Sequence, residues 1–277
     1  MTAQHTIARA VRISGIGLHT GAPTAVRLLP APPDHGVVFS RVDLADAPLI
    51  PARLTEVVAT ERGIVLGRQA RVATVEHLLS AAMGLQIDNL TAEVDGEELP
   101  CGDGSGQIFT DALRQAGLAA QHAPRRPIAV ETPVWAGGGS SLIVALPAPR
   151  LRVTALVTAE RTPIPAQLAE FDTEIDDFAA AIAPARTWGL AAEAEALRAR
   201  GLARGASFAT ALVIGPEGYL NEPRFANELA RHKILDAIGD LALLGRPLQA
   251  HLVAIRSGHS LHVTLAHEIA RAVGLER

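Results

Sequence analysis

Apolar residues recur at two spacings along this chain, and these spacings divide it into short strands and helices. Alternation of apolar and polar positions predicts strands over residues 6–14, 26–29, 36–41, 90–94, 128–134, 141–146, 151–157, 209–214 and 248–255. Apolar residues three and four positions apart predict helices over residues 72–83, 109–118, 176–182, 191–199 and 261–273, and a long helix around His232. Each half is therefore a set of strands followed by helices, which favours an α+β fold over a strict βαβ repeat.

The length of the chain fits two domains of ordinary size. It has 277 residues, and a segment rich in proline and arginine, residues 121–127, lies near the middle. We therefore predict an N-terminal α+β domain over residues 1–123 and a C-terminal α+β domain over residues 127–277.

The long helix carries the first candidate chemistry. His232, Asp236 and Asp240 are spaced four residues apart, so their side chains project from one face of that helix. A histidine and a carboxylate at this spacing can hold one metal ion from a single rigid element. Taken alone, the same pattern also fits a solvated polar stripe on a surface helix.

A second stretch, residues 74–78, favours the metal site over the solvated stripe. It places Glu76 directly before His77, again in a helical apolar pattern. One His-Asp pair and one distant histidine give three ligands, with a fourth position open for water, as in catalytic rather than structural zinc sites. The alternative for Glu76 is an ordinary charge on a helix surface.

Composition limits the remaining classes of function. Apolar residues make up 48% of the chain, and Cys101 is its single cysteine, so a large core forms without disulfides and a reducing compartment fits. A net charge of -4 without a long basic block, and only 3% aromatic residues, argue against nucleic-acid binding. Since there is no apolar run of transmembrane length and no signal peptide, we expect a cytoplasmic protein, and nothing calls for more than a monomer.

Several stretches resemble one family. Residues 17–21, 74–78, 88–89, 103–105, 185–189, 205–208, 220–222, 231–240 and 257–259 resemble, in the same order, the LpxC family of UDP-3-O-acyl-N-acetylglucosamine deacetylases, which act in lipid A synthesis. The resemblance implies two similar domains, each a sheet layered against helices, with the active site between them. It also implies a UDP-linked acylated amino sugar as the substrate.

The resemblance assigns roles to individual residues. It implies zinc held by His77, His232 and Asp236, although imidazole and carboxylate ligands also suit Fe2+. Glu76 would be the general base, and His259, oriented by Asp240, would act as a cation or general acid. Thr187 would donate a hydrogen bond to the oxyanion. The residues expected to contact the substrate are Lys233, Leu18, His19 and Trp188.

Some positions depart from the family pattern and leave alternatives open. Residues 160–167 lack the family's usual His-Pro pair, so a paralogue acting on a different N-acylated sugar is one alternative. A metal-containing binding protein without turnover is another, although the base and the acid are both present. Residues 193–202, rich in alanine, fall where the family forms its acyl-chain passage. His262 and His267 match no motif position, and we predict structural roles for them.

Overall fold

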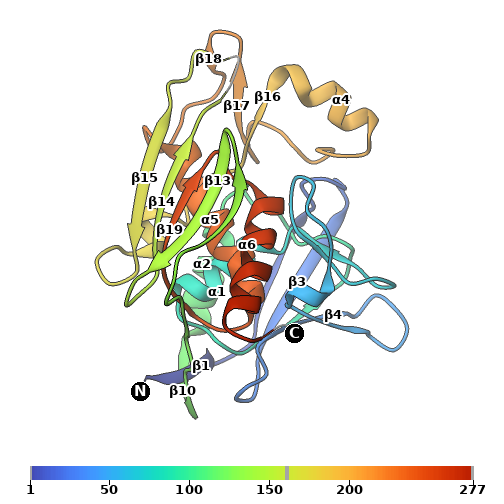
Figure 1. The fold of residues 1–277 in the computed structure, drawn as a ribbon. Coiled ribbons are helices and arrows are strands. Elements are labelled where there is room, and N and C mark those ends of the chain that lie inside the picture. The colour runs from blue at the N-terminus through green and yellow to red at the C-terminus, as the bar shows by residue number, and fades with distance from the viewer. Residues whose placement is uncertain (1, 160–161, 276–277) are drawn as a thin grey trace.

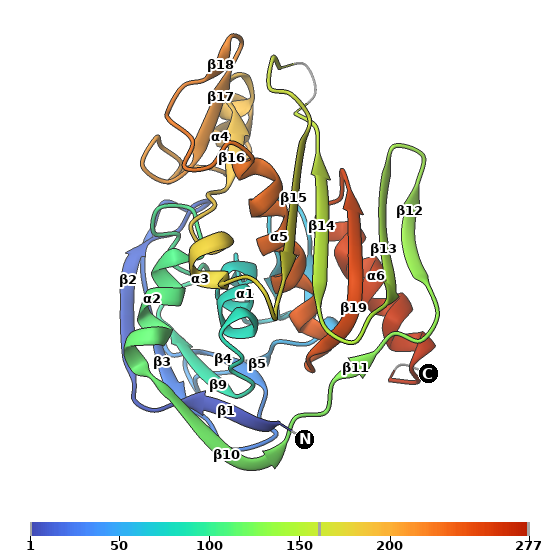
Figure 2. The ribbon, with the colours of Figure 1, turned by 90° about the vertical axis from the view of Figure 1, so that its left-hand side faces the viewer.

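Two β-sheets form the outer layers of the protein, and its longest helices lie between them (Figure 1). This computed structural model describes residues 2–159 and 162–275. Figure 2, turned by 90°, shows one sheet built from the first part of the chain and the other from the second. The arrangement is the predicted α+β fold, in which each half layers a sheet against helices.

The first half builds a five-stranded sheet with the order β2 (Val11–Ile16), β3 (Pro23–Pro30), β9 (Leu90–Val94), β4 (Val37–Arg41) and β5 (Leu49–Pro51). Its helices are α1 (Glu76–Gly84), α2 (Gln107–Ala116) and the 3-10 turn η1 (Leu54–Glu56). A small sheet contains β6 (Val57–Ala59), β7 (Val65–Leu66) and β8 (Val72–Ala73). The first strand, β1 (Ala3–Ile7), pairs antiparallel with β10 (Leu118–Pro124).

The second half builds a larger sheet with the order β12 (Val134–Gly138), β13 (Ser141–Pro147), β19 (Leu248–Ile255), β14 (Arg152–Val157) and β15 (Gln167–Asp172), while β11 (Ile128–Ala129) also pairs with β19. Its main helices are α5 (Glu228–Leu241) and α6 (His259–Ala272), and a shorter one is α3 (Phe178–Ala181). A small sheet projects from it, made of β16 (Trp188–Leu190), β17 (Leu212–Gly215) and β18 (Gly218–Tyr219). Beside it lie η2 (Ala191–Glu193) and α4 (Ala194–Ala199), and η3 (Ala242–Leu244) follows α5.

The central strand β19 shows how the alternating pattern forms the core. Leu248, Ala250, Leu252 and Ala254 are buried, while the residues between them are only partly covered. Because successive side chains point to opposite faces of a strand, one face of the sheet packs on the helices and the other faces outward. The apolar positions of α1 and α5 are buried in the same central layer, where these two helices pack against each other.

Helices α1 and α5 approach closely because of one glycine. A Cβ atom placed on Gly239 would overlap the backbone of Glu76, at the first turn of α1. A larger side chain at this position would therefore push the two helices apart. The close approach brings residues from both halves of the chain to one place in the middle of the protein.

Several elements differ from the sequence predictions. The helix expected over 72–83 begins only at Glu76, because Val72 and Ala73 pair as β8 and Thr74 has a positive φ of 58°. The strand expected over 6–14 is two strands, β1 and β2. The expected connector at 121–127 is shorter, since β10 continues to Pro124. Strand β15 was not predicted at all. Within the described ranges, every helix is too short or too polar to cross a bilayer.

Candidate active site

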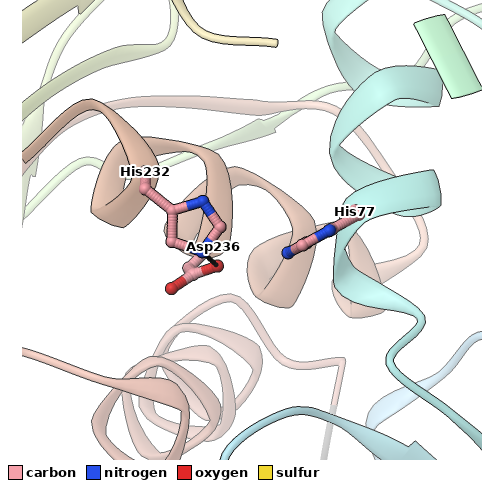
Figure 3. A group of neighbouring side chains, drawn as sticks. All are labelled: His77, His232 and Asp236. Atoms are coloured by element: carbon pink, nitrogen blue, oxygen red, sulfur yellow. Dashed lines mark ion pairs between the residues drawn. The ribbon is translucent and has the colours of Figure 1, made fainter. Parts of the chain in front are cut away.

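Three potential metal ligands meet between α1 and α5. His77 lies on the first turn of α1, and His232 and Asp236 lie one turn apart on α5; Figure 3 shows the three side chains directed toward one another. Each offers a ligand atom, and these atoms lie within 4.8 Å of one another. All three side chains are buried, which excludes the solvated stripe as an explanation for the pattern on α5.

The hydrogen bonds of these residues leave the inward-facing atoms free for a cation. His232 Nδ1 lies 3.0 Å from the carbonyl oxygen of Ala185, so this nitrogen carries the proton and Nε2 presents a lone pair. That lone pair faces Asp236 Oδ1 at 3.3 Å, and Oδ1 is buried with no hydrogen-bond partner among the described residues. Two lone pairs facing each other in a dry interior repel, and a shared cation would relieve that repulsion.

The protonation states agree with this interpretation. Burial lowers the pKa of His77 to about 3 and also lowers the pKa of His232, so both imidazoles are neutral. Burial alone would raise the pKa of Asp236, but nearby positive charge, including Lys233 Nζ at 2.7 Å from Oδ2, holds it well below its ordinary value. Two neutral imidazoles and one carboxylate are the forms in which these side chains bind metals. The residues therefore fit a divalent ion.

Glu76 is buried beside these ligands, not exposed on a helix surface. Its Oε2 accepts one hydrogen bond, from the backbone N–H of Ile64 at 3.0 Å. Burial raises the pKa of Glu76 to about 7, although the positive charge of His259 opposes the shift. A carboxyl group with a pKa near neutrality can both take up and release a proton at working pH.

A second cluster lies one turn further along α5. Asp240 Oδ2 accepts hydrogen bonds from His259 Nδ1 at 2.8 Å and from His262 Nδ1 at 2.7 Å. Burial would lower the pKa of His259, but the carboxylates of Asp240 and Asp236 outweigh it and raise the pKa to about 9. His259 is therefore a cation at neutral pH. His262 is fully buried and also contacts Ser257, so it supports Asp240, as its predicted structural role requires.

One cavity of about 640 Å³ exposes these groups. Most residues predicted for the site line it, namely Leu18, Glu76, His77, Thr187, Trp188, His232, Lys233, Asp236 and His259. Asp240 and His19 are not part of the cavity wall. Two cationic residues that the sequence reasoning missed, Arg62 and Arg256, do line it. Both have a positive φ, which the sequence gives no means of recognising.

His19 was expected to contact the substrate, but its side chain lies among backbone groups of other segments. Its ring lies 3.0 Å from the carbonyl oxygen of Arg62 and accepts a hydrogen bond from the Ala203 N–H. The backbone of the same loop accepts hydrogen bonds from Arg204 and Gly205. His19 thus connects the first half of the chain to the segment that follows α4, rather than facing the cavity.

Glu98 holds this loop and was missed by the sequence reasoning. It is buried, and its carboxylate accepts hydrogen bonds from the backbone N–H groups of His19 and Thr20, both at 2.8 Å. The hydroxyls of Thr20 and Thr74 donate to it as well, at 2.7 and 3.0 Å. Thr74 stands two residues before Glu76, so a single carboxylate fixes both the loop and the entry to α1.

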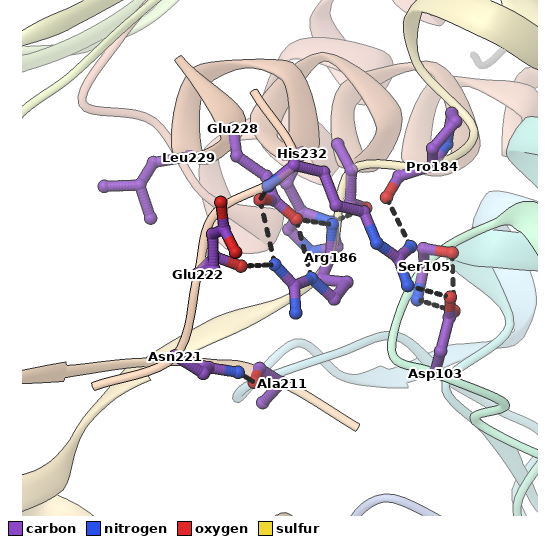
Figure 4. A network of polar contacts seen from close by, with 12 residues as sticks. Asp103, Ser105, Pro184, Arg186, Ala211, Asn221, Glu222, Glu228, Leu229 and His232 are labelled. Atoms are coloured by element: carbon purple, nitrogen blue, oxygen red, sulfur yellow. Dashed lines mark hydrogen bonds and ion pairs between the residues drawn. The ribbon is translucent and has the colours of Figure 1, made fainter. Parts of the chain in front are cut away.

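A buried ion pair positions Thr187. Figure 4 shows Arg186 against Glu228 at the start of α5, with Nε–Oε1 at 2.8 Å and Nη2–Oε2 at 3.2 Å. Burial would raise the pKa of Glu228, but hydrogen bonds from Arg186 and Arg224 lower it below its ordinary value. Thr187, the next residue, donates its backbone N–H to the carbonyl of Gly104 at 2.7 Å. The sequence shows both charged residues but not that they are buried together.

Among the described residues, the two stretches that depart from the family pattern contribute only Glu193 to the cavity wall. Of the stretch 160–167, Glu160 and Arg161 are outside the described residues, and none of 162–167 lines the cavity. Gln167 instead accepts hydrogen bonds from the Leu229 and Ala230 N–H groups at the start of α5. In the alanine-rich segment, Glu193 lines the cavity and α4 itself does not.

Known proteins match this chain over nearly its whole length, including every residue of the site described above. A family model described as LpxC, UDP-3-O-acyl N-acetylglycosamine deacetylase, matches residues 4–271. A protein of Trichormus variabilis named UDP-3-O-acyl-N-acetylglucosamine deacetylase is 42% identical over 273 residues, which is 96% of this chain and 98% of the relative. A Myxococcus xanthus protein of the same name is 41% identical over 98% of this chain and 86% of its own length. The Bdellovibrio bacteriovorus protein of that name is 38% identical, with coverages of 97% and 90%.

Proposed function

The chain belongs to the LpxC family of UDP-3-O-acyl-N-acetylglucosamine deacetylases, and on this premise we propose that it hydrolyses the N-acetyl group of UDP-3-O-acyl-N-acetylglucosamine in lipid A biosynthesis. The observation that carries the proposal is the meeting of His77, His232 and Asp236 with Glu76 and His259 in one cavity. Amide hydrolysis needs an activated water, a stabilised oxyanion and a proton for the leaving amine, and this cavity holds a group for each.

His77, His232 and Asp236 would hold the metal, which we propose to be zinc. Bound zinc supplies a water of lowered pKa and polarises the amide carbonyl. The same ligand set also accommodates Fe2+, so the ion is decided by metal analysis of the purified protein.

The other residues of the site handle protons and charge. Glu76 takes the proton of the attacking water, a role typically worth about 10²–10⁴-fold in rate. The cationic ring of His259 faces the developing negative charge and supplies the proton that the departing amine needs. Asp240 and His262 keep that ring in place and charged, so Asp240 is a positioning residue. The Thr187 hydroxyl donates to the oxyanion.

Substrate contacts are proposed for the remaining cavity residues. Lys233 reaches the site from α5, where its Nζ lies 2.7 Å from Asp236 Oδ2. Leu18 and Trp188 supply apolar surface on opposite halves of the chain. His19 would act indirectly, by holding the backbone of Arg62.

The domain boundary stays a proposal. We place it within the connector between residues 123 and 127, because each large sheet draws its strands from only one side of that point. A cytoplasmic monomer remains our expectation. A paralogue that acts on a different N-acylated sugar gains no support, since the described part of 160–167 lies off the cavity. A metal-containing protein without turnover gains none either, since both Glu76 and His259 line the cavity.

The deciding experiment is acetate release from UDP-3-O-acyl-N-acetylglucosamine by metal-replete wild type beside Glu76→Ala. We expect turnover by the wild type, a loss of about 10²–10⁴-fold in the variant, and equal metal content in both. Glu131→Ala, at an exposed glutamate outside the cavity, is the matched control and keeps full activity. A folded, metal-loaded wild type that releases no acetate would refute the substrate, and full activity of Glu76→Ala would refute the mechanism.

A further inference from the structure

A second cavity, of about 250 Å³, lies where the two halves of the chain and their connector meet. The first half contributes residues from β1 and from the loops around β4, β5 and β9, and the second half contributes the turn after η3. Its lining residues are Gln4, Asp34, Gly36, Arg53, Asp88, Asn89, Arg125, Arg126, Gly245, Arg246 and Pro247. It shares no residue with the cavity that holds His77, His232 and Asp236.

This cavity is positively charged although the protein as a whole is acidic. Four arginines and two aspartates line it, a formal excess of two positive charges, whereas the whole chain carries -4. Asp88 is already engaged, because its Oδ1 accepts a hydrogen bond from Arg125 Nε at 2.8 Å. Asp34 accepts a hydrogen bond from the Gln4 amide at 2.7 Å. Within the part of the chain that the structure describes, Arg53, Arg126 and Arg246 therefore have no ion pair with a carboxylate.

Arg53 is the first of these unneutralised groups. It is half-buried, and among the described residues its side chain has no hydrogen bond or ion pair. Two glycines make room for its guanidinium. A Cβ atom on Gly36 would lie 3.2 Å from Nη2, and one on Gly245, which has a φ of 71°, would overlap Nη1. The guanidinium therefore lies against the backbone of both halves of the chain, with its donors unused.

Arg246 is the second arginine of this cavity whose guanidinium has donors free. Its Nε donates to the carbonyl of Arg126 at 2.6 Å, and its Nη2 donates to the carbonyl of Pro127 at 3.3 Å. These carbonyls fix the orientation of the guanidinium, and no carboxylate among the described residues forms an ion pair with it. Two guanidinium groups therefore share one cavity, that of Arg53 packed against Gly36 and Gly245 and that of Arg246 held by hydrogen bonds, and each keeps donors free for a ligand.

We propose that this cavity binds a small phosphate-bearing anion at the junction of the two halves. Arginine forks match the oxygens of a phosphate in pairs, and a doubly charged phosphate balances the excess of two positive charges. The volume of about 250 Å³ is far larger than the roughly 10–15 Å³ that a cavity needs to hold one water molecule. It therefore accommodates a phosphate together with an attached group. The bound anion would hold Arg53 of one half and Arg246 of the other, and so stabilise their relative position.

Calorimetric titration and thermal unfolding with inorganic phosphate and with pyrophosphate test this site directly, at an ionic strength kept constant with NaCl. We expect saturable binding to the wild type, weakened about tenfold or more in Arg53→Gln and Arg246→Gln, because each loses charge-assisted hydrogen bonds. Arg68→Gln, at an exposed arginine outside the cavity, is the control and keeps wild-type affinity. Lys233→Ala also keeps wild-type affinity for phosphate. Because Lys233 lines only the first cavity, this result shows that the anion does not bind there.

Three results would overturn the proposal: no stabilisation beyond that of NaCl, unchanged affinity in both glutamine variants, or loss of binding in Lys233→Ala alone. Tighter binding of citrate than of either phosphate would show a carboxylate site instead. Where a glutamine variant does not fold, Arg53→Lys and Arg246→Lys replace it. They keep the charge but lose the paired donors, so several-fold weaker binding supports the site and unchanged binding counts against it.

Discussion

Glu98 provides the sharpest test of how the fold holds the site. Among the described residues, four groups form hydrogen bonds with its carboxylate, all of them as donors, and they differ in whether they can turn away. The N–H groups of His19 and Thr20 are fixed by the backbone, whereas the hydroxyls of Thr20 and Thr74 can rotate. A substitution at residue 98 should therefore cost stability in proportion to the number of backbone N–H groups that it leaves without an acceptor.

The size of the stability loss follows from the number of backbone N–H groups that lose their acceptor. A buried donor without a partner costs roughly 1–3 kcal/mol. Glu98→Ala leaves two backbone N–H groups unpaired, so we expect a loss of about 2–6 kcal/mol in the free energy of unfolding. Glu98→Gln keeps one acceptor oxygen and turns an amide NH₂ toward the other N–H group. We therefore expect about half that loss, roughly 1–3 kcal/mol.

Urea unfolding of the wild type and both variants, followed by circular dichroism, measures these losses. Glu93→Ala is the control. Glu93 forms a surface ion pair with Arg27 and no other side-chain contact among the described residues, so its loss should stay within about 0.5 kcal/mol. The reasoning fails if Glu98→Gln is as stable as the wild type, or if it is less stable than Glu98→Ala.

The remaining predictions concern the metal, the oxyanion, pH and a thiol. Removing the metal with a chelator lowers the melting temperature, and zinc at about 100 times its Kd restores about 2.7 kcal/mol; no change on chelation would contradict the ligand set. Thr187→Ala lowers kcat about 10²–10³-fold with little change in KM, if its hydroxyl serves the oxyanion. Glu228 has a folded pKa below its unfolded value of about 4.3, so its stabilisation is complete above that pH and is lost as the pH falls through the folded pKa. Acid unfolding of Glu228→Gln should show a correspondingly weaker pH dependence, although the variant is less stable at neutral pH because Arg186 loses its charged partner. Burial raises the pKa of Cys101 to about 11, so iodoacetamide at pH 8 should modify it only after unfolding.

The parts of the fold that the sequence predicts well depend on local spacing. Strands β9 and β19 match their predicted bounds, and α5 falls around His232 as expected, because alternation and helical recurrence are properties of neighbouring residues. The same spacing placed His232 and Asp236 on one face of α5. That His77 joins them depends on the packing of α1 against α5, which no local pattern contains. The Glu76–His77 pair suggested a third ligand, and the family resemblance implied the same residue.

The sequence predictions that were wrong concern contacts between separate segments of the chain. Residues 121–127 contain two prolines and polar residues typical of a connector, yet β10 extends through Pro124 because β1 offers a partner far away in the sequence. Glu98 and Glu228 belong to a residue type that is usually exposed, and donors that come largely from distant segments make their burial favourable. Val72 and Ala73 fit a helix by apolar spacing, but pairing with β7 and the positive φ of Thr74 delay the start of α1.

That delay is part of how the site is built. Because α1 begins at Glu76, the proposed base and the ligand His77 occupy its first turn, where the chain has just left Thr74 and the hydrogen bond to Glu98. A helix begun at residue 72 would bury the same two side chains in its middle, out of reach of that anchor. On the other side, Gly239 lets α5 approach the backbone of Glu76 directly. The relative position of the three ligands is therefore set from two directions, by a buried carboxylate within the first half of the chain and by a missing side chain in the second.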